Sequence, residues 1–297
     1  MNRPDFLIIG LERSGGHWVS ALLNAHPDIA CFPTTYFVPG KSRIGELHFF
    51  NTLASILEPK RPFVRPFDDF SWKFGGRYAD LVPQRGTVSD EKLIRMFVRR
   101  YDEICEGERG GKRIVGELSS RYVFFLDWID RLYPGIKKIC ILRDPKDRIV
   151  SWYKKKVVQE QGGEEGMVPR AFALEYARNN VVAEYEMLLA YTGSIHCLSY
   201  ETLHANPVPV VEGIIEHLGM RHAPATVAKM IREASFENQA EQNDGKARRA
   251  GEEAQSPLRK GIVGDFKNAM TESVAREVDG ITRDVEARVF KKYSIIE

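Results

Sequence analysis

The 297-residue chain has few cysteines and no long apolar run. The cysteines have neither a CxxC pair nor metal-site spacing, and they are Cys31, Cys105, Cys140 and Cys197. This pattern predicts free thiols and no metal centre. The first apolar run is too short for a signal peptide, and no stretch approaches the length of a transmembrane helix. We therefore expect a reduced, cytoplasmic protein.

An excess of charge of one sign is also missing. The chain has 43 Lys and Arg against 41 Asp and Glu, a formal net charge of +2. A balance this close creates no general field that would attract nucleic acid or a membrane surface. We expect no nucleic-acid partner, and any anion site must be built from a local cluster of residues.

The third absence lies in a glycine-rich loop. The apolar run Phe6–Gly10 is followed by Leu-Glu-Arg-Ser-Gly-Gly-His-Trp over residues 11–18 and then by apolar residues at helical spacing. A strand, a tight loop and a helix start in this order form a phosphate cradle, because free N–H groups and the positive end of the helix dipole meet there. Gly10 and Gly15 have the spacing of a Walker A loop, but Gly16 and His17 replace its lysine and hydroxyl residue. The loop therefore predicts a ligand that carries phosphate or sulfate without a bound metal, and its only cation is Arg13.

Short apolar runs alternate with helical patterns along much of the chain. We predict strands at 6–10, 113–118, 138–142 and 194–199, and helices at 17–25, 122–132, from about 146, 171–191 and 207–218. Strands separated by helices imply crossover connections and hence an α/β fold with a central, mostly parallel sheet flanked by helices. Ligands bind such sheets at the carboxyl ends of the strands, which are Gly10, Leu118, Leu142 and Ser199.

Two stretches interrupt this alternation within what we take to be one domain over 1–297. Residues 33–112 include a segment rich in proline, aromatic residues and arginine, which we interpret as an irregular insertion on the acceptor side; a small core of its own is the alternative. Residues 237–257 are polar, and we expect a mobile loop there.

Two further basic segments are candidates for binding the same anion. Arg143 follows the strand that ends at Leu142, and Ser151 lies at a helical spacing that brings its hydroxyl towards the same place. The alternative for Arg143 is a structural pair with Asp147. Near the C-terminus, Arg259-Lys260-Gly261 combines two cations with a glycine that permits close approach of the backbone.

Taken together, these segments resemble the sulfotransferase family that uses 3′-phosphoadenosine 5′-phosphosulfate (PAPS). The resemblance extends from Phe6 to Asn268, leaves about 33–112 unmatched, and includes Ser199-Tyr200-Glu201 and Ser235-Phe236. It implies a P-loop-like three-layer fold and, by position, these donor-binding residues: Arg13, Ser14, Gly15, Gly16, His17, Trp18, Arg143, Ser151, Tyr200, Phe236, Arg259, Lys260 and Gly261. Arg13 takes the place of the family's lysine beside the bridging oxygen of the phosphosulfate.

The chain departs from the family in its loop and at its candidate base. The family usually has threonines where Gly16 and His17 stand, and its small-molecule branch has a histidine where this chain has Glu117. Glu117 is similar to the glutamate base of the carbohydrate-modifying branch, although Leu118 replaces the lysine that follows it there. A carboxylate can accept the proton of an attacking hydroxyl. A structural role for Glu117 and a base role for His17 are the alternatives.

The resemblance implies a metal-independent, in-line transfer of a sulfuryl group from PAPS to a hydroxyl or amine, with Arg13 stabilising the leaving oxygen. Glu117 points to a carbohydrate or glycolipid acceptor. The competing hypotheses are a P-loop kinase, which needs the missing Lys-Ser/Thr pair, and a nucleotide-binding protein without catalysis.

Overall fold

The computed structural model describes residues 3–32, 48–64, 78, 80–84, 86–159, 162, 166–238 and 261–295. Five parallel strands form one sheet in the order β2-β3-β1-β4-β5. Their bounds are β1 Phe6–Gly10, β2 Ile29–Phe32, β3 Ile114–Ser119, β4 Lys137–Leu142 and β5 His196–Ser199. The predicted α/β fold with a parallel central sheet is confirmed. The four predicted strands are present, and β2 is an addition.

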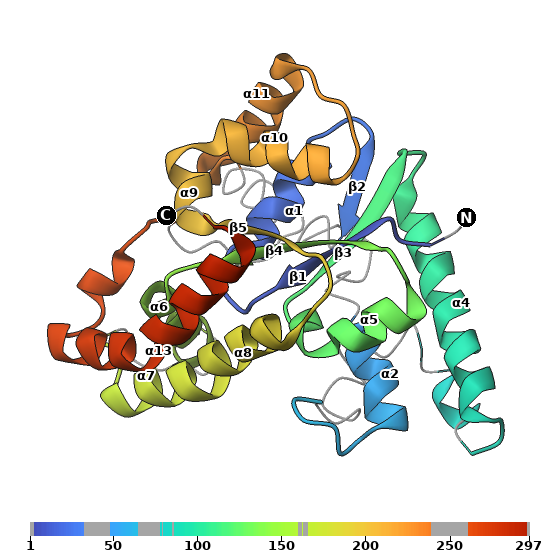
Figure 1. The fold of residues 1–297 in the computed structure, drawn as a ribbon, viewed down its shortest axis with the longest axis horizontal. Coiled ribbons are helices and arrows are strands. Elements are labelled where there is room, and N and C mark those ends of the chain that lie inside the picture. The colour runs from blue at the N-terminus through green and yellow to red at the C-terminus, as the bar shows by residue number, and fades with distance from the viewer. Residues whose placement is uncertain are drawn as a thin grey trace.

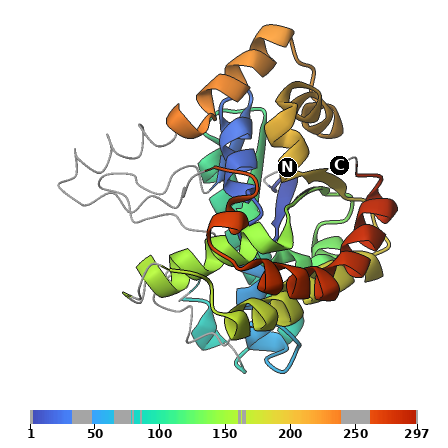
Figure 2. The same cartoon turned by 90° about the vertical axis from the view of Figure 1, so that its left-hand side faces the viewer.

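Helices cover both faces of the sheet (Figures 1 and 2). Their bounds are α1 Gly16–Asn24, α2 Phe49–Leu57, α4 Asp90–Arg109, α5 Leu126–Leu132, α6 Pro145–Tyr153, α7 Arg170–Tyr176, α8 Ala183–Ala190, α9 Tyr200–Ala205, α10 Pro207–His217, α11 Pro224–Glu233 and α13 Glu272–Tyr293. Short 3₁₀ helices occupy Val82–Gln84, Tyr122–Phe125 and Asp265–Asn268. In the parts of the chain described, no helix is long and apolar enough to cross a membrane.

Alternation along the strands divides the core between the two faces of the sheet. Phe6 and Ile8 of β1 pack with α1, α10 and α11, whereas Leu7 and Ile9 belong to the core that includes α2, α4, α8 and α13. Successive side chains of a strand point to opposite faces, so a single strand supplies both cores. The same rule separates neighbouring residues of β3 at the site described below.

The described residues within 33–112 include helices α2 and α4, which corrects the prediction of an irregular insertion for 49–57 and 90–109. Helix α4 begins after the capping residue Ser89 and ends at Gly110, which adopts a left-handed conformation with φ 56°. Its buried residues recur every fourth position and form one stripe, and they are Leu93, Phe97, Tyr101 and Cys105. That stripe was the helical signal within the insertion.

The long helix predicted over 171–191 is interrupted. Helix α7 passes into a π-helical stretch, Ala177–Val182, before α8 continues the same path. The predicted mobile loop at 237–257 lies outside the described residues from position 239 onward.

Candidate functional site

The loop between β1 and α1 is a tight turn with two residues in left-handed conformations. Arg13 has φ 65° and Gly15 has φ 104°. Ser14 directs its backbone N–H and its hydroxyl back to the carbonyl of Leu11, at 3.2 and 2.7 Å. Helix α1 follows at once, and Gly15 supplies no side-chain cap. The first N–H groups of α1 therefore have no side-chain cap, as the predicted anion cradle requires.

Two loop glycines are required by neighbouring side chains. A Cβ added at Gly15 would lie 2.6 Å from Cδ2 of Tyr200, and one added at Gly16 would lie 2.7 Å from Cδ1 of Leu118. Both separations are far below van der Waals contact. The chain departs from the family pattern at both Gly16 and Leu118. The lack of a side chain at Gly16 therefore leaves the room that the Leu118 side chain occupies.

A cavity of about 550 Å³ opens above this loop at the carboxyl end of the sheet. Its lining includes ten of the predicted donor-binding residues: Arg13, Gly15, Gly16, His17, Trp18, Arg143, Ser151, Tyr200, Phe236 and Gly261. These residues come from five stretches of the chain, at 13–18, 143–151, 200, 236 and 261. A volume in this range suits a small organic ligand of nucleotide size.

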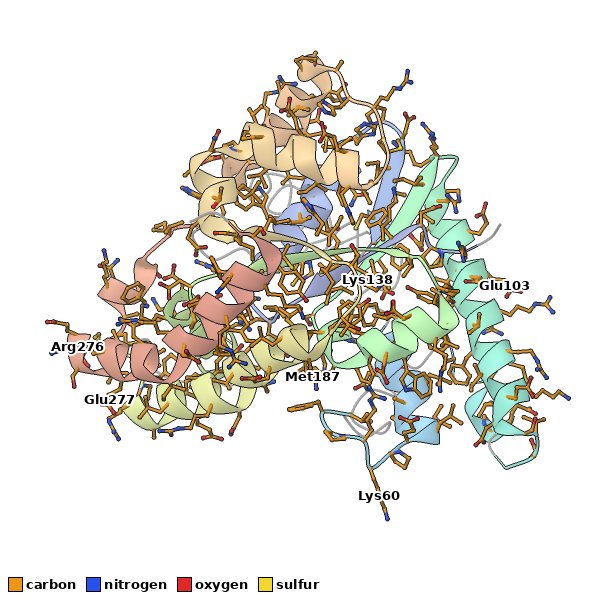
Figure 3. The ribbon with its side chains drawn as sticks, viewed as in Figure 1. Lys60, Glu103, Lys138, Met187, Arg276 and Glu277 are labelled. Carbon is orange, nitrogen blue, oxygen red and sulfur yellow. The ribbon has the colours of Figure 1, made fainter. Side chains whose placement is uncertain are left out.

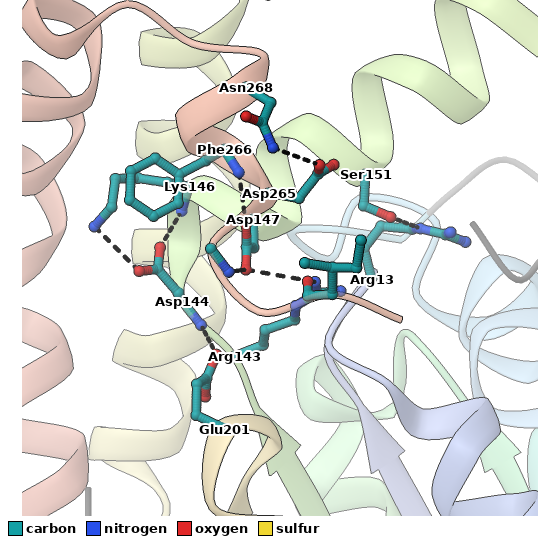
Figure 4. Close-up of polar contacts among 12 residues, drawn as sticks. Arg13, Arg143, Asp144, Lys146, Asp147, Ser151, Glu201, Asp265, Phe266 and Asn268 are labelled. Carbon is teal, nitrogen blue, oxygen red and sulfur yellow. Dashed lines mark hydrogen bonds and ion pairs between the residues drawn. The ribbon is translucent and has the colours of Figure 1, made fainter. Parts of the chain in front are cut away.

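Within the cavity lining, the side chain of Arg13 is held by helix α6. Its Nε donates a hydrogen bond of 2.9 Å to Oγ of Ser151 (Figure 4). The sequence suggested that Ser151 would contact the same anion as Arg143. Ser151 instead holds the loop cation, and both residues line the cavity.

Arg143, the second cation that lines the cavity, lies between an aromatic ring and a carbonyl. Its guanidinium carbon is 4.3 Å from the ring centroid of Tyr200, and its Nη2 donates to the carbonyl of Ile262 at 3.0 Å. Its Nε is buried without a hydrogen-bond partner among the described residues. A buried, unsatisfied cationic donor beside a cavity fits an anionic ligand, because an anion would satisfy it.

Asp147 fixes the turn that contacts Arg143. It is fully buried, accepts N–H groups of Gly264 and Phe266 at 2.7 and 2.9 Å, and lies 3.5 Å from Nη2 of Arg143 (Figure 4). The Arg143–Asp147 pair considered from the sequence is therefore present, and it coexists with a cavity-lining position for Arg143. Gly261 begins this turn with φ 65°, and a Cβ there would lie 2.9 Å from the ring of Phe236.

Aromatic side chains line the same cavity as Arg13 and Arg143. The rings of Trp18 and Tyr200 meet edge to face at 5.3 Å, and Phe236 lines the same cavity. The sequence analysis did not identify His204, which also lines the cavity and whose ring centroid lies 6.4 Å from that of Trp18. His204 stands four residues after Tyr200 on α9, and this spacing was the signal that could have found it.

Glu117 lies on the other face of β3. It is fully buried, and its Oε2 accepts hydrogen bonds of 2.5 Å from the hydroxyls of Tyr101 and Tyr122. Leu118, the next residue, lines the cavity, whereas Glu117 does not. Glu117, the candidate base from the sequence, therefore lies outside the donor cavity, because alternation along β3 turns its side chain into the aromatic core. Burial, with the charge of Glu117 adding to it, raises the pKa of both tyrosines well above the ordinary range, so they stay protonated and donate.

One predicted donor-binding residue among those described, Ser14, does not line the cavity, and two others are not described. Ser14 is fully buried and closes the loop on Leu11 without lining the cavity. Arg259 and Lys260 lie outside the described residues, which resume at Gly261.

Residues 131–294 match the family model of the sulfotransferase domain. Among curated proteins, cytosolic sulfotransferases 16 and 17 of Arabidopsis thaliana are both 29% identical, over 170 and 171 residues. These matches cover 50% of this chain and 50% and 49% of the relatives. The chain thus spans about half the length of the curated relatives it matches.

Solved structures share the fold. The mouse sulfotransferase SULT7A1 complexed with PAP has a TM-score of 0.58 at 18% identity, covering 99% of this chain and 89% of that one. A sulfotransferase from Alicyclobacillus acidocaldarius has a TM-score of 0.53 at 19% identity, covering 99% and 97%. A retinol dehydratase in a complex with retinol and PAP has a TM-score of 0.55 at 13% identity, covering 95% and 81%. At these identities the likeness concerns the fold, including its P-loop-like sheet and loop.

Proposed function

Because the chain belongs to the sulfotransferase domain family, we propose that it transfers a sulfuryl group from PAPS to a hydroxyl or amine of a small acceptor. The observation that carries the proposal is the arrangement of the cavity. The loop with Arg13, Arg143 with its unsatisfied Nε, and the rings of Trp18 and Tyr200 all line one cavity. Two cationic groups and a helix N-terminus beside aromatic rings suit an adenine nucleotide that is charged at both its 5′ and 3′ positions.

The residues divide the binding of such a donor between them. The N–H groups at the start of α1 would hold the 5′-phosphate, and Arg143 with the turn at Gly261 would hold the 3′-phosphate. Arg259 and Lys260 are proposed for the same 3′-phosphate from the family resemblance alone. Trp18, Tyr200 and Phe236 would face the adenine. Two of the fold neighbours, mouse SULT7A1 and a retinol dehydratase, are complexes with PAP, which supports a nucleotide of this kind as the ligand.

The donor supplies an activated sulfuryl group. In the transfer, a bond forms between the acceptor atom and sulfur while the bond from sulfur to the bridging oxygen breaks, and the acceptor loses a proton. Arg13 would stabilise the negative charge that develops on the bridging oxygen, together with the N-terminus of α1. The hydrogen bond that Arg13 Nε donates to Oγ of Ser151 restricts the Arg13 side chain.

We assign the proton acceptor to Glu117. The assignment rests on the resemblance of Glu117 to the glutamate base of the carbohydrate-modifying branch, since Glu117 does not line the cavity that Leu118 lines. His17, the other candidate, lines the cavity on the side of the leaving group, and this position suits donor binding better. Tyr101 and Tyr122 would orient the carboxylate through its Oε2.

The resemblance of Glu117 to the base of the carbohydrate-modifying branch leads us to propose a carbohydrate or glycolipid hydroxyl as the acceptor. Access to Glu117 must come from the face of the sheet covered by α2 and α4, because both tyrosines that contact it belong to that core.

The test is sulfuryl transfer by the purified chain, with ³⁵S-labelled PAPS and a panel of sugars, glycolipids, phenols and amines. We expect labelled product and stoichiometric adenosine 3′,5′-bisphosphate in the presence of EDTA. Tight binding of this nucleotide without transfer to any acceptor would favour a non-catalytic nucleotide-binding protein. A strict requirement for Mg²⁺ and ATP would favour a kinase.

Glu117→Gln tests the base. It keeps an oxygen that can accept from the tyrosines but removes the basic carboxylate, so turnover should fall at least 100-fold, since general-base catalysis contributes about 10²–10⁴-fold. Nucleotide affinity should stay within about threefold of wild type. His17→Gln is the matched control, and a larger loss of turnover in that variant would transfer the base role to His17.

A further inference from the structure

A buried ion pair from two helices grips the backbone of the loop next to Arg13. Nε of Arg148 on α6 donates 2.9 Å to the carbonyl of Glu12, and Oε1 of Glu184 on α8 accepts the N–H of Glu12 at 3.3 Å. Nη2 of Arg148 donates to Oε2 of Glu184, which closes the network. Arg148 and Glu184 are 0% and 1% exposed. Both polar backbone groups of one loop residue are therefore held by side chains from distant parts of the chain.

The residue that follows is the loop cation. Arg13 adopts φ 65°, a conformation that non-glycine residues hold only where their surroundings impose it. Helix α6 contacts this short segment twice, through Arg148 on the backbone of Glu12 and through Ser151 on the side chain of Arg13. Arg148 and Ser151 are three residues apart, so they lie on the same face of α6. One rigid helix thus fixes both the backbone before Arg13 and the guanidinium itself.

The network is poorly suited to a role in stability alone. Nη1 of Arg148 is buried without a hydrogen-bond partner in the part of the chain that the structure describes. Buried ion pairs contribute little net stability even when fully satisfied, and unsatisfied buried donors are costly. Arg121 adds a further charge, with its Nη1 3.8 Å from Oε1 of Glu12. Such a costly network concentrated on one catalytic loop points to a requirement for its geometry.

We propose that Arg148 and Glu184 are positioning residues that hold the loop so that Arg13 faces the leaving oxygen. This inference rests on the proposed function for the identity of that oxygen. It does not depend on the proposed function for the claim that the pair determines where Arg13 lies.

The principal variant is Arg148→Lys. Lysine keeps the positive charge beside Glu184 but cannot reproduce the two separate donations of the guanidinium, so the hydrogen bond to the Glu12 carbonyl should be lost. Relative to the wild type, we expect kcat to fall at least tenfold and nucleotide affinity to stay within about threefold. The melting temperature should stay close to that of the control variant Lys138→Met, which is described below. Glu184→Gln is the second variant, because its amide oxygen can still accept the N–H of Glu12.

The control is Lys138→Met. Lys138 is a buried cation, 4% exposed, whose Nζ lies 2.6 Å from Oδ1 of Asp130. It stands near the amino end of β4, away from the loop at the carboxyl end of the sheet (Figure 3). This variant removes an ion pair between buried Lys138 and the partly exposed Asp130 without touching the loop, so any fall in melting temperature should not be accompanied by a fall in kcat.

Two readouts separate positioning from general damage. In a double-mutant cycle with Arg13→Ala, the effect of Arg148→Lys on single-turnover transfer should disappear, because the residue it positions is absent. The ¹⁵N–¹H signal of Arg13 Nε, identified by its loss in Arg13→Lys, should shift in Arg148→Lys and Glu184→Gln but not in Lys138→Met. This second measurement needs no turnover.

Additive effects in the cycle, or an unshifted Arg13 signal, would overturn the positioning role. If the wild-type chain shows no transfer but the Arg13 signal shifts as expected, the positioning role stands and the proposed activity is wrong.

Discussion

The contact between Gly16 and Leu118 makes a quantitative prediction about the loop. Gly16 begins α1, and a Cβ placed on it would lie 2.7 Å from Cδ1 of Leu118, which is 1% exposed. In Gly16→Ala the leucine must repack in a closed environment, and overpacking of this kind costs about 1–3 kcal/mol. Alanine recovers about 0.5–1 kcal/mol of helix propensity. We expect a net loss of roughly 0.5–2 kcal/mol in the free energy of unfolding.

Leu118→Ala should remove this clash while costing about 2–5 kcal/mol itself, through the cavity it leaves. The double variant Gly16→Ala/Leu118→Ala should therefore be more stable than the sum of the two single effects, by about 1–3 kcal/mol. Urea unfolding of the wild type, both single variants and the double variant measures this coupling energy directly.

Gly10, the last residue of β1, provides the matched control next to the same loop. A Cβ there would lie 2.8 Å from Cα of Ser120 and 3.0 Å from the carbonyl oxygen of Ser119, so the clash is with backbone. Repacking of a side chain cannot relieve it, and Gly10→Ala should combine additively with Leu118→Ala. Additivity for Gly16, or an equal coupling for Gly10, would refute the view that Leu118 is what excludes a side chain from position 16.

Two further predictions concern the buried carboxylates. Asp147→Asn should release the turn at 262–266, because the carboxylate accepts two backbone N–H groups there and hydrogen bonds to charged groups are worth about 1.5–3 kcal/mol. Calorimetry should then show that adenosine 3′,5′-bisphosphate binds about tenfold more weakly. Unchanged affinity would contradict this role of Asp147. Burial, opposed by the charge of Arg148 and assisted by that of Glu12, raises the pKa of Glu184 to about 7. Since the folded state then binds this proton more tightly than the unfolded chain, the contribution to stability is fully present below the ordinary value of 4.5 and is lost as pH rises through about 7. In urea unfolding the wild type should therefore lose stability relative to Glu184→Gln between pH 5 and pH 8, and the absence of this loss would show that Glu184 is charged throughout.

Much of the site could be predicted because its signals are local. The glycine spacing after β1, the proline at the start of α6 and the basic residue at the tip of β4 each depend on a few neighbouring residues. Period-two alternation within β3 also follows from the sequence, and it required that Glu117 and Leu118 point to opposite faces. The α4 stripe was equally local, but the surrounding proline and aromatic residues obscured its helical period.

The sequence by itself determined the parallel α/β arrangement, the phosphate loop without a Walker lysine and the segments that line the cavity. Only the tertiary structure decided which face of β3 carries the cavity, and therefore that Leu118 lines it while Glu117 lies among tyrosines. It also brought Glu184 to the N–H of Glu12, 172 residues earlier in the chain. The physical reason is the range of the interactions: helix periods, caps and turns are fixed by neighbours in sequence, whereas burial and ion pairing depend on which distant elements pack together.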